Sequence, residues 1–270
     1  MAVIVLGSVA GAPGVTTTAV AAALNWPRPV VLLEADLSRP SSILPGLLRG
    51  QVDHSRGLTP LAVDHQRGTL TIDSLWAQTV QIAPDRYLVP GFASPAAARG
   101  TTAVFWGRLG ETVAALESGN LDVLVDAGRI DVADPRFALM QLADQVTLMA
   151  RPVLPDVAVL RARRGDVVSQ LDAVGKGDAV ALALVDADHE TFSNAEISRS
   201  LGLPVLARLP WDSRTAAVYS VGAASSKKTE TSPLGRAIAA LTTTTTQAIR
   251  DRRARLGVQP TERTEETTTA

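Results

Sequence analysis

Near its N-terminus the chain reads VIVLGSVAGAPGVTTT, residues 3–18, and continues into an alanine-rich segment, residues 19–24. The apolar, β-branched start is typical of a buried strand, the glycine-bearing middle of a turn, and the alanines of a helix. Gly11 and Gly14 allow the backbone to curl so that successive N–H groups point inward beside the helix N-terminus. The stretch therefore predicts a strand, a loop and a helix around a concave anion site.

Two hydroxyl side chains follow this loop. Thr16 stands where such loops keep a hydroxyl ligand for Mg²⁺, and Thr17 is placed to cap the helix or to contact a phosphate. The same elements would also form if the segment only packed in a core, so both interpretations stay open. The candidate binding residues of the loop are Gly11, Ala12, Pro13, Gly14, Val15, Thr16 and Thr17.

The loop resembles the deviant Walker A motif of the ParA/MinD family of P-loop proteins, which reads roughly Lys-Gly-Gly-x-Gly-Lys-Thr-Thr. On this chain the motif falls on residues 10–17, and its two lysine positions hold Ala10 and Val15. The first lysine anywhere in the chain is Lys176. In the family these lysines neutralise the phosphates and the charge that develops during hydrolysis, so their loss weakens binding and costs catalysis more.

The resemblance also assigns two carboxylates at strand ends. The apolar run at residues 29–36 ends in Asp36, which matches an acid that in the family orients the attacking water or the Mg²⁺ shell. Residues 121–126 resemble a Walker B strand closing on Asp126, and Mg²⁺ prefers such hard oxygen ligands. The implied metal ligands are Thr16, Asp36 and Asp126, with Asp36 also the catalytic candidate. A solvated strand end or an N-cap is the alternative for Asp36.

Residues 37–42 correspond to the family's switch loop, where Arg39 is a candidate surrogate cation. Arg129, after the Walker B strand, is either another source of positive charge or one half of a surface ion pair. Val-Asp-His occurs twice, ending at His54 and His65, but the spacing matches no metal motif.

A base pocket is implied further along the chain. The strand at residues 178–186 ends in Asp186, where the family commonly has an asparagine that reads adenine; a carboxylate only accepts, so base identity stays open. Residues 204–212 resemble the family's late strand and Ile-Pro-x-Asp turn, which places Pro210 and Asp212 beside the base. Trp211 is placed either to stack on a base or to cap a hydrophobic edge.

Strand and helix patterns alternate along the chain, which predicts an α/β fold with a doubly wound, mostly parallel sheet. We expect an α/β domain over 1–225, a hinge and C-terminal helix over 226–256, and a disordered tail over 257–270. The expected helices cover 43–48, 103–116, 134–142, 156–174 and 232–256, with a strand at 86–91 and a polar hinge at 220–231.

Composition excludes several classes of function. The 270 residues carry a net charge of -1 and no cysteine, so disulfides and thiolate metal sites are excluded and no global attraction to nucleic acid is expected. The apolar N-terminal run is short, and no stretch approaches a membrane span, so a cytoplasmic protein is expected. The basic end of the last helix is predicted to dock on the domain, with contact to DNA, a membrane or a partner as alternatives.

Two functions of different classes follow. The first is a nucleotide-dependent positioning or partitioning protein that binds ATP or ADP with Mg²⁺, hydrolyses ATP slowly or not at all, and forms a homodimer with a protein partner. The second is a non-enzymatic scaffold at a pilus, secretion or conjugation assembly. A ligase or reductase of the wider fold group would need a second substrate site or metal-cluster ligands, and the chain has no cysteine for the latter.

Overall fold

One sheet organises the protein, whose computed structural model describes residues 1–11, 13–116, 120–187 and 191–257. Within these ranges the sheet has eight strands in the order β3-β4-β2-β5-β1-β6-β7-β8. All neighbouring strands are parallel except β3 and β4, so the predicted α/β class is confirmed. The strands are β1 Val3–Ser8, β2 Val30–Glu34, β3 Val80–Ala83, β4 Arg86–Val89, β5 Asp122–Arg129, β6 Gln145–Ala150, β7 Val180–Val185 and β8 Val205–Leu209.

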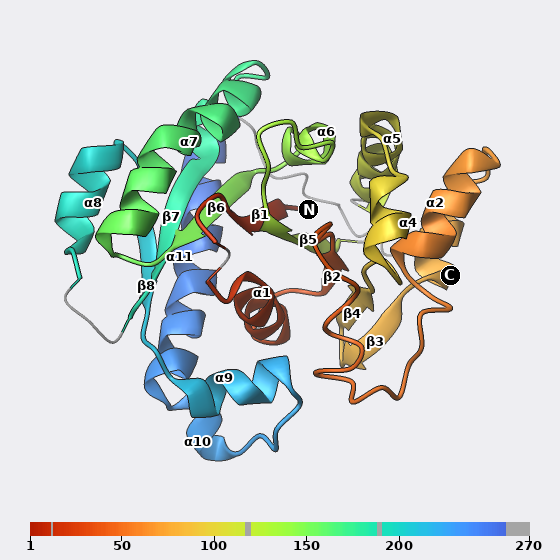
Figure 1. Ribbon diagram of the computed structural model, residues 1–270, viewed down its shortest axis with the longest axis horizontal. Coiled ribbons are helices and arrows are strands. Elements are labelled where there is room, and N and C mark those ends of the chain that lie inside the picture. Colours follow the sequence, from red (N-terminus) through yellow and green to blue (C-terminus); the bar gives the residue numbers. More distant parts are fainter. Residues whose placement is uncertain (12, 117–119, 188–190, 258–270) are drawn as a thin grey trace, which may run out of the picture.

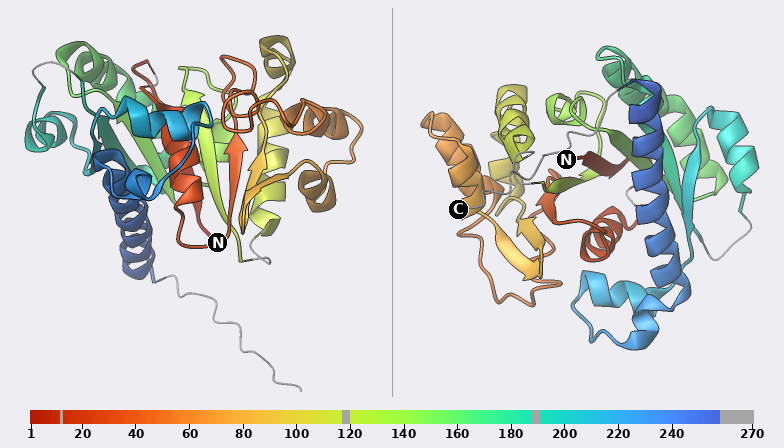
Figure 2. Two further views of the ribbon diagram at one scale, coloured as in Figure 1. Left: turned by 90° about the horizontal axis from the view of Figure 1, so that it is seen from below. Right: turned by 180° about the vertical axis from the view of Figure 1, so that it is seen from behind.

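Helices cover both faces of this sheet (Figures 1 and 2). One face carries α1, α9 and α11, and the other carries α2, α3, α5, α6, α7 and α8. The helices are α1 Val15–Leu24, α2 Leu58–Gln66, α3 Ile72–Ala77, α4 Pro95–Arg99, α5 Ala103–Ala114, α6 Phe137–Met140, α7 Leu154–Asp172, α8 Asn194–Leu201, α9 Ser213–Ser220, α10 Lys227–Glu230 and α11 Pro233–Arg255. No helix in the described ranges is long and apolar enough to cross a membrane.

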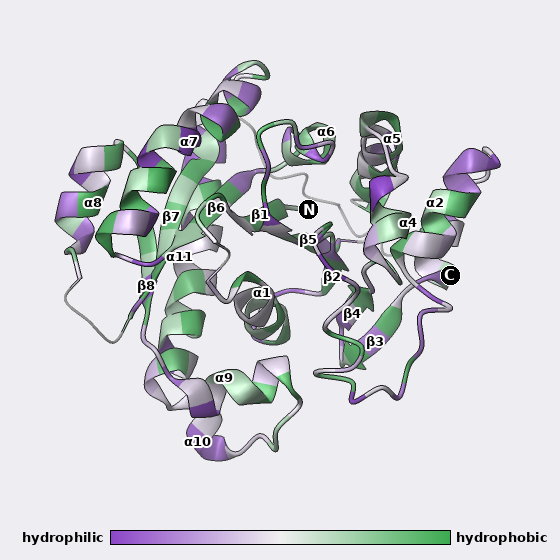
Figure 3. Ribbon diagram, viewed as in Figure 1, coloured by the Kyte–Doolittle hydropathy of each residue, from purple (hydrophilic) through white to green (hydrophobic). Residues whose placement is uncertain are grey.

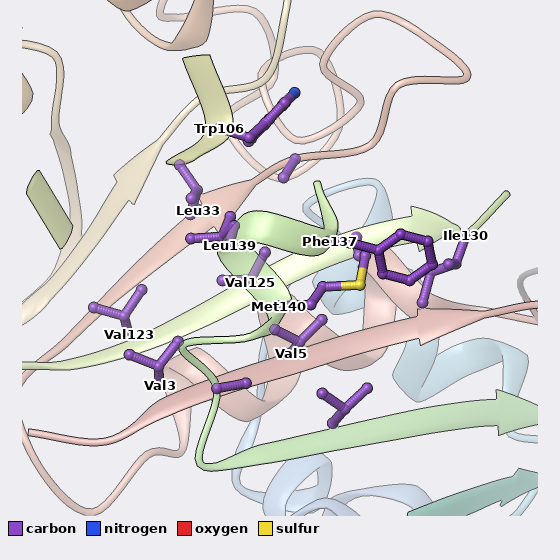
Figure 4. Close-up of a cluster of buried hydrophobic side chains, with 14 of the residues drawn as sticks. Val3, Val5, Leu33, Trp106, Val123, Val125, Ile130, Phe137, Leu139 and Met140 are labelled. Carbon is purple, nitrogen blue, oxygen red and sulfur yellow. The ribbon is translucent and has the colours of Figure 1, made fainter. Parts of the chain in front are cut away.

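The core follows from the two-residue period of the strands. In β1, Val3 and Val5 face one hydrophobic cluster, whereas Ile4 and Leu6 face the other. The central strands are therefore buried on both sides. The green of β7 in Figure 3 shows how hydrophobic such a strand is along its length. Figure 4 shows the first cluster, where Val5 packs near Met140 of α6.

Several predicted elements differ in detail. Residues 43–48 form turns instead of a helix, because Pro45 and Gly46 interrupt the segment. The helix expected over 134–142 is shortened to α6, and the hinge expected over 220–231 contains α10. The strand expected at 86–91 is β4, but it pairs with β3 in an antiparallel hairpin that the sequence reading missed.

The C-terminal helix α11 packs on the sheet. Its buried face contacts β8, α1 and α9, and Ser232 caps its start by accepting a hydrogen bond from the Gly235 N–H. At its other end Arg252 pairs with Asp178 at 2.7 Å, and Arg253 pairs with Asp144 at 2.9 Å. This basic end is used for docking. Residues 258–270, most of the expected disordered tail, lie outside the described residues.

Candidate functional site

The loop between β1 and α1 has the backbone that its glycines predict. Gly11 and Gly14 have φ angles of 101° and 70°, in the left-handed region that favours glycine. Gly14 is the N-cap of α1, which has no side-chain cap, so Thr17 does not cap this helix. A Cβ added at Gly11 or Gly14 would meet no atom within 4 Å. The loop therefore borders open space; Ala12 lies outside the described residues.

Two cavities meet at this loop. The larger, about 450 Å³, is polar and is lined by Gly11, Gly14, Val15, Thr16, Thr17, Asp36, Ser38, Arg39, Gly128 and Arg129. The smaller, about 170 Å³, is more apolar and is lined by Pro13, Gly14, Thr17, Thr18, Val185, Leu209, Pro210, Trp211, Asp212, Ser213, Ala216 and Leu234. Gly14 and Thr17 line both cavities. Five of the predicted loop residues thus line the polar cavity, and Pro210 and Asp212 of the predicted base pocket line the neighbouring apolar one.

Asp36 and Asp126 lie at the same end of the sheet, because β2 and β5 are parallel neighbours and both acids stand near the carboxyl ends of these strands. Asp126 in β5 is 0% exposed. Its Oδ1 accepts a hydrogen bond from the Gly128 N–H at 3.0 Å, whereas Oδ2 has no hydrogen-bond partner among the described residues. Burial raises the pKa of Asp126 to about 7, helped by the charges of Glu34 and Asp36 and opposed by the Thr16 hydroxyl and the Gly128 amide.

Asp36 already accepts three hydrogen bonds from its own loop. Its Oδ1 accepts from the N–H and hydroxyl of Ser38, at 2.9 and 2.7 Å. Its Oδ2 accepts from Nε of Arg39 at 3.1 Å, and Nη2 of Arg39 donates to the Thr16 hydroxyl at 2.6 Å. Arg39 therefore joins the end of β2 to the start of α1.

This arrangement decides how well the site suits a metal. A hydroxyl and two carboxylates are the donor types that Mg²⁺ prefers, and the bare Oδ2 of Asp126 is a ready oxygen ligand. The other two candidate ligands, Thr16 and Asp36, are both occupied by Arg39. As arranged, the set does not fit Mg²⁺, because only one of its three members is free.

Glu34 has a structural task that the sequence did not reveal. Its buried carboxylate accepts from the backbone N–H groups of Ser42, Ile43 and Gly91 at 2.8, 3.3 and 3.0 Å, and from the Ser41 hydroxyl. The acid thus fixes the path of the segment that follows β2, including Arg39.

Arg136 is a second contributor that sequence reading missed. It is 1% exposed, pairs with Asp134 at 2.5 Å, and donates to the backbone carbonyls of Ala35, Ala127 and Arg129. Burial acts to raise the pKa of Asp134, but Arg136 outweighs it and holds that pKa below its usual range. The guanidinium thus ties the ends of β2 and β5 together beneath the polar cavity. The sequence analysis placed both residues in a helix expected over 134–142, whereas they precede α6.

Gly128 supports Asp36 by close approach. Its φ is 52°, and an added Cβ would lie 2.3 Å from Cγ of Asp36. We expect Gly128→Ala to displace this carboxylate and to lower the free energy of unfolding by about 1–3 kcal/mol, measured by urea denaturation. Gly175→Ala is the control, because Gly175 has a φ of 71° with no atom near its added Cβ. Equal decreases in the free energy of unfolding in the two variants would show that the clash with Asp36 does not destabilise the protein.

The base side differs from the expectation for Asp186. Its Oδ1 accepts from Nε of Arg208 at 2.6 Å, and this side chain does not line the smaller cavity. Pro210 and Asp212 do line it, and Asp212 also caps α9 by accepting from the Thr215 N–H at 3.0 Å, which holds the Asp212 pKa below its usual range. Trp211 lines the same cavity and is 61% exposed, so its ring is accessible to a ligand there.

His54 and His65, the histidines of the two Val-Asp-His segments, build no metal centre with the other described residues. His65 packs edge-on against Phe105, with ring centroids 5.5 Å apart. Over the part of the chain that the structure describes, no group of three or more His, Cys, Asp or Glu side chains could hold a metal ion.

Comparisons with known proteins give one consistent result. No family model matches the sequence, and no curated protein matches it. Among solved structures, a ParA family ATPase from Chlorobium tepidum TLS superposes with a TM-score of 0.68 at 18% identity, covering 90% of this chain and 98% of that one. The MinD cell division protein of Aquifex aeolicus gives a TM-score of 0.67 at 17% identity, covering 97% and 100%.

The septum site-determining protein MinD from Pyrococcus horikoshii OT3, complexed with Mg-ADP, gives a TM-score of 0.64 at 17% identity and covers 89% and 94%. At these identities the likeness establishes architecture. The eight-stranded, mostly parallel sheet with helices on both faces agrees with it. This chain therefore has the P-loop fold of the ParA/MinD family ATPases.

Proposed function

We propose that this protein binds a nucleotide, ATP or ADP, and acts in the cytoplasm to position or partition a plasmid, chromosome or protein machinery, with weak or no ATP hydrolysis. The observation that carries the proposal is the pair of cavities meeting at Gly14 and Thr17, one polar and one more apolar. Their shared border matches a ligand with an anionic half and a flat apolar half. The shared architecture with ParA and MinD proteins supports the positioning role.

The chain's own groups account for binding. The N-terminus of α1 and the left-handed glycines beside it suit phosphate binding through backbone N–H groups, and Arg39 and Arg129 add positive charge to the polar cavity. Pro210 and Trp211 offer apolar surface to the base on the other side of the loop. Asp186 is paired with Arg208, so its carboxylate is not offered to the base. The preference for one base over another then depends on the shape of the apolar surface.

Slow hydrolysis follows from the same groups. The loop has no cation to stabilise charge that develops on a transferred phosphoryl group. Asp36, the catalytic candidate, is committed to Ser38 and Arg39, so it must be released before it can orient a water. Mg²⁺ accompanies ADP in the Pyrococcus horikoshii MinD structure; here Asp126 would be its ready ligand, with Thr16 and Asp36 available only after Arg39 leaves them.

The scaffold function is the second candidate, favoured by the missing lysines and by the Arg39 bridge across the site. Both candidates include a homodimer and a protein partner, and a complex of MinC with the similar Aquifex aeolicus MinD supports the latter in general. Contact with DNA or a membrane is not part of the proposal, because Arg252 and Arg253 of the basic helix end are paired with Asp178 and Asp144.

Nucleotide binding is tested with a matched pair of glycine variants. Gly14 and Gly68 have φ angles of 70° and 72°, and neither has an atom within 4 Å of an added Cβ, but only Gly14 borders the cavities. Asparagine tolerates this conformation, so both Gly14→Asn and Gly68→Asn should fold. We expect calorimetric titration with ATP or ADP to show saturable binding that Gly14→Asn weakens by about tenfold or more and Gly68→Asn leaves unchanged. Absence of binding at millimolar nucleotide would favour the scaffold.

Trp211 provides an optical readout of the base side. Trp26 and Trp106 are buried and Trp76 is partly buried, whereas Trp211 is exposed at the smaller cavity. We expect nucleotide to quench or shift tryptophan emission because a base approaching this ring changes its surroundings. The change should vanish in Trp211→Phe and persist in Trp76→Phe. A signal retained in Trp211→Phe would place the base elsewhere.

A further inference from the structure

We infer that Arg39 is the built-in cation of this site and that it makes polyphosphate binding independent of Mg²⁺. The inference rests on the proposed nucleotide-binding function and concerns the cofactor requirement of the same site. It starts from an arrangement in which one side chain contacts both Thr16 and Asp36, two of the three residues that would otherwise hold a metal.

The guanidinium is fixed on two sides and open on the third. Nε is held by Asp36 at 3.1 Å and Nη2 by the Thr16 hydroxyl at 2.6 Å. Nη1 makes no hydrogen bond within the described ranges, and the side chain is 49% exposed on the polar cavity. A planar guanidinium held in this way can donate to phosphate oxygens with little further loss of side-chain conformational entropy. The backbone that carries it is fixed in turn by Glu34, through the N–H groups of Ser42 and Ile43.

The charge around the cavity supports the same conclusion. Among the described residues that line it, the cations are Arg39 and Arg129 and the carboxylate is Asp36. Lys176, the first lysine of the chain, instead donates to the Leu142 carbonyl away from the cavity. Arg39 already pairs with Asp36, so Arg129 adds an uncompensated positive charge to the lining, while the acids Asp126 and Glu34 are buried nearby and do not line the cavity.

Mg²⁺ would have to compete for this position. Binding to Thr16 and Asp36 requires breaking both contacts of Arg39, one of which is a charge-assisted pair, and Mg²⁺ demands near-ideal octahedral geometry. A dication placed beside the guanidinium would also be repelled by it. A polyphosphate, by contrast, adds negative charge to Arg39 without disturbing either contact.

The experiment compares binding of ADP and of inorganic pyrophosphate by calorimetry, in Mg²⁺ and in EDTA. We expect wild-type affinity in EDTA to lie within about threefold of that in Mg²⁺, and Arg39→Gln to lose about tenfold or more in EDTA. Adding Mg²⁺ should restore part of this loss, because Thr16 and Asp36 are then free to hold the metal. Arg39 is exposed, so folding of the variant is expected and is checked by its melting temperature.

Arg129→Gln is the matched control. It removes the same charge from the same cavity without touching Thr16 or Asp36, so it should weaken binding equally in Mg²⁺ and EDTA. The inference is wrong if wild-type binding collapses in EDTA, or if Arg39→Gln shows no greater Mg²⁺ dependence than Arg129→Gln; in either case nucleotide binding itself stands. If neither ligand binds the wild type in any condition, the proposed function fails as well.

Discussion

At about pH 8 the Asp126→Asn variant should have a free energy of unfolding about 4 kcal/mol higher than that of the wild-type protein. This difference should become smaller as the pH falls. The reason is the buried carboxylate with a free Oδ2, whose pKa burial raises to about 7. A group whose folded-state pKa lies above its unfolded value stabilises fully below the unfolded value of 3.8 and loses that contribution as the pH rises through about 7. Asparagine has nearly the same shape and stays neutral throughout.

Urea denaturation of both proteins from about pH 4 to pH 8 measures this gap, and comparison at each pH removes the contribution of the other carboxylates. Asp131→Asn is the control, because it removes an exposed carboxylate five residues further along and should change stability little at any pH. A gap that stays constant with pH would mean that Asp126 is ionised in the folded protein with a compensating partner.

The second large effect is expected at Arg136. Its replacement by methionine removes the charged partner of the buried Asp134 carboxylate, which keeps only hydrogen bonds from the backbone N–H groups of residues 131 and 136, and removes a donor from three backbone carbonyls. We therefore expect a loss of about 3–5 kcal/mol in the free energy of unfolding. Thermal melting and urea denaturation measure the loss.

Arg108→Met is the matched control, because Arg108 forms an exposed pair with Glu111 on α5 and should contribute little. Adding Asp134→Leu to Arg136→Met removes the unpaired charge and should recover part of the loss. If Arg136→Met is as mild as Arg108→Met, the guanidinium does not hold the strand ends together.

Local sequence patterns predicted the fold, the glycine loop and the two acids at the strand ends. The run at residues 3–18 specified the strand, the left-handed glycines and the helix, because each depends on the residues at that position. Asp36 and Asp126 were identified because each follows an apolar run at a position where the resemblance to the ParA/MinD family places an acid. Parallel neighbouring strands then bring the two acids to the same end of the sheet.

The remaining features depend on contacts between distant segments. Arg39 contacts Thr16, and the turn that carries Arg39 is held by Glu34, whose carboxylate accepts from the N–H groups of Ser42 and Gly91. Gly91 is 57 residues from Glu34, so no short sequence motif contains this contact. Arg136 lies in a polar stretch, and only the folded chain buries it. The β3–β4 hairpin was missed because Asp85 supplies the positive φ of 55° at a position that carries no glycine.

The docking of α11 has a consequence for the order of events during synthesis. Arg253 in the last helix donates to the Met1 carbonyl at 2.6 Å and to Asp144, whose other oxygen accepts from the Val3 N–H at 2.9 Å. The beginning of the central strand is therefore secured by residues that leave the ribosome some 250 positions later. Such long-range closure is slow. The contact that fixes the start of β1 therefore cannot form until residue 253 has been synthesised, whereas its pairing with β5 and β6 needs only the first 150 residues.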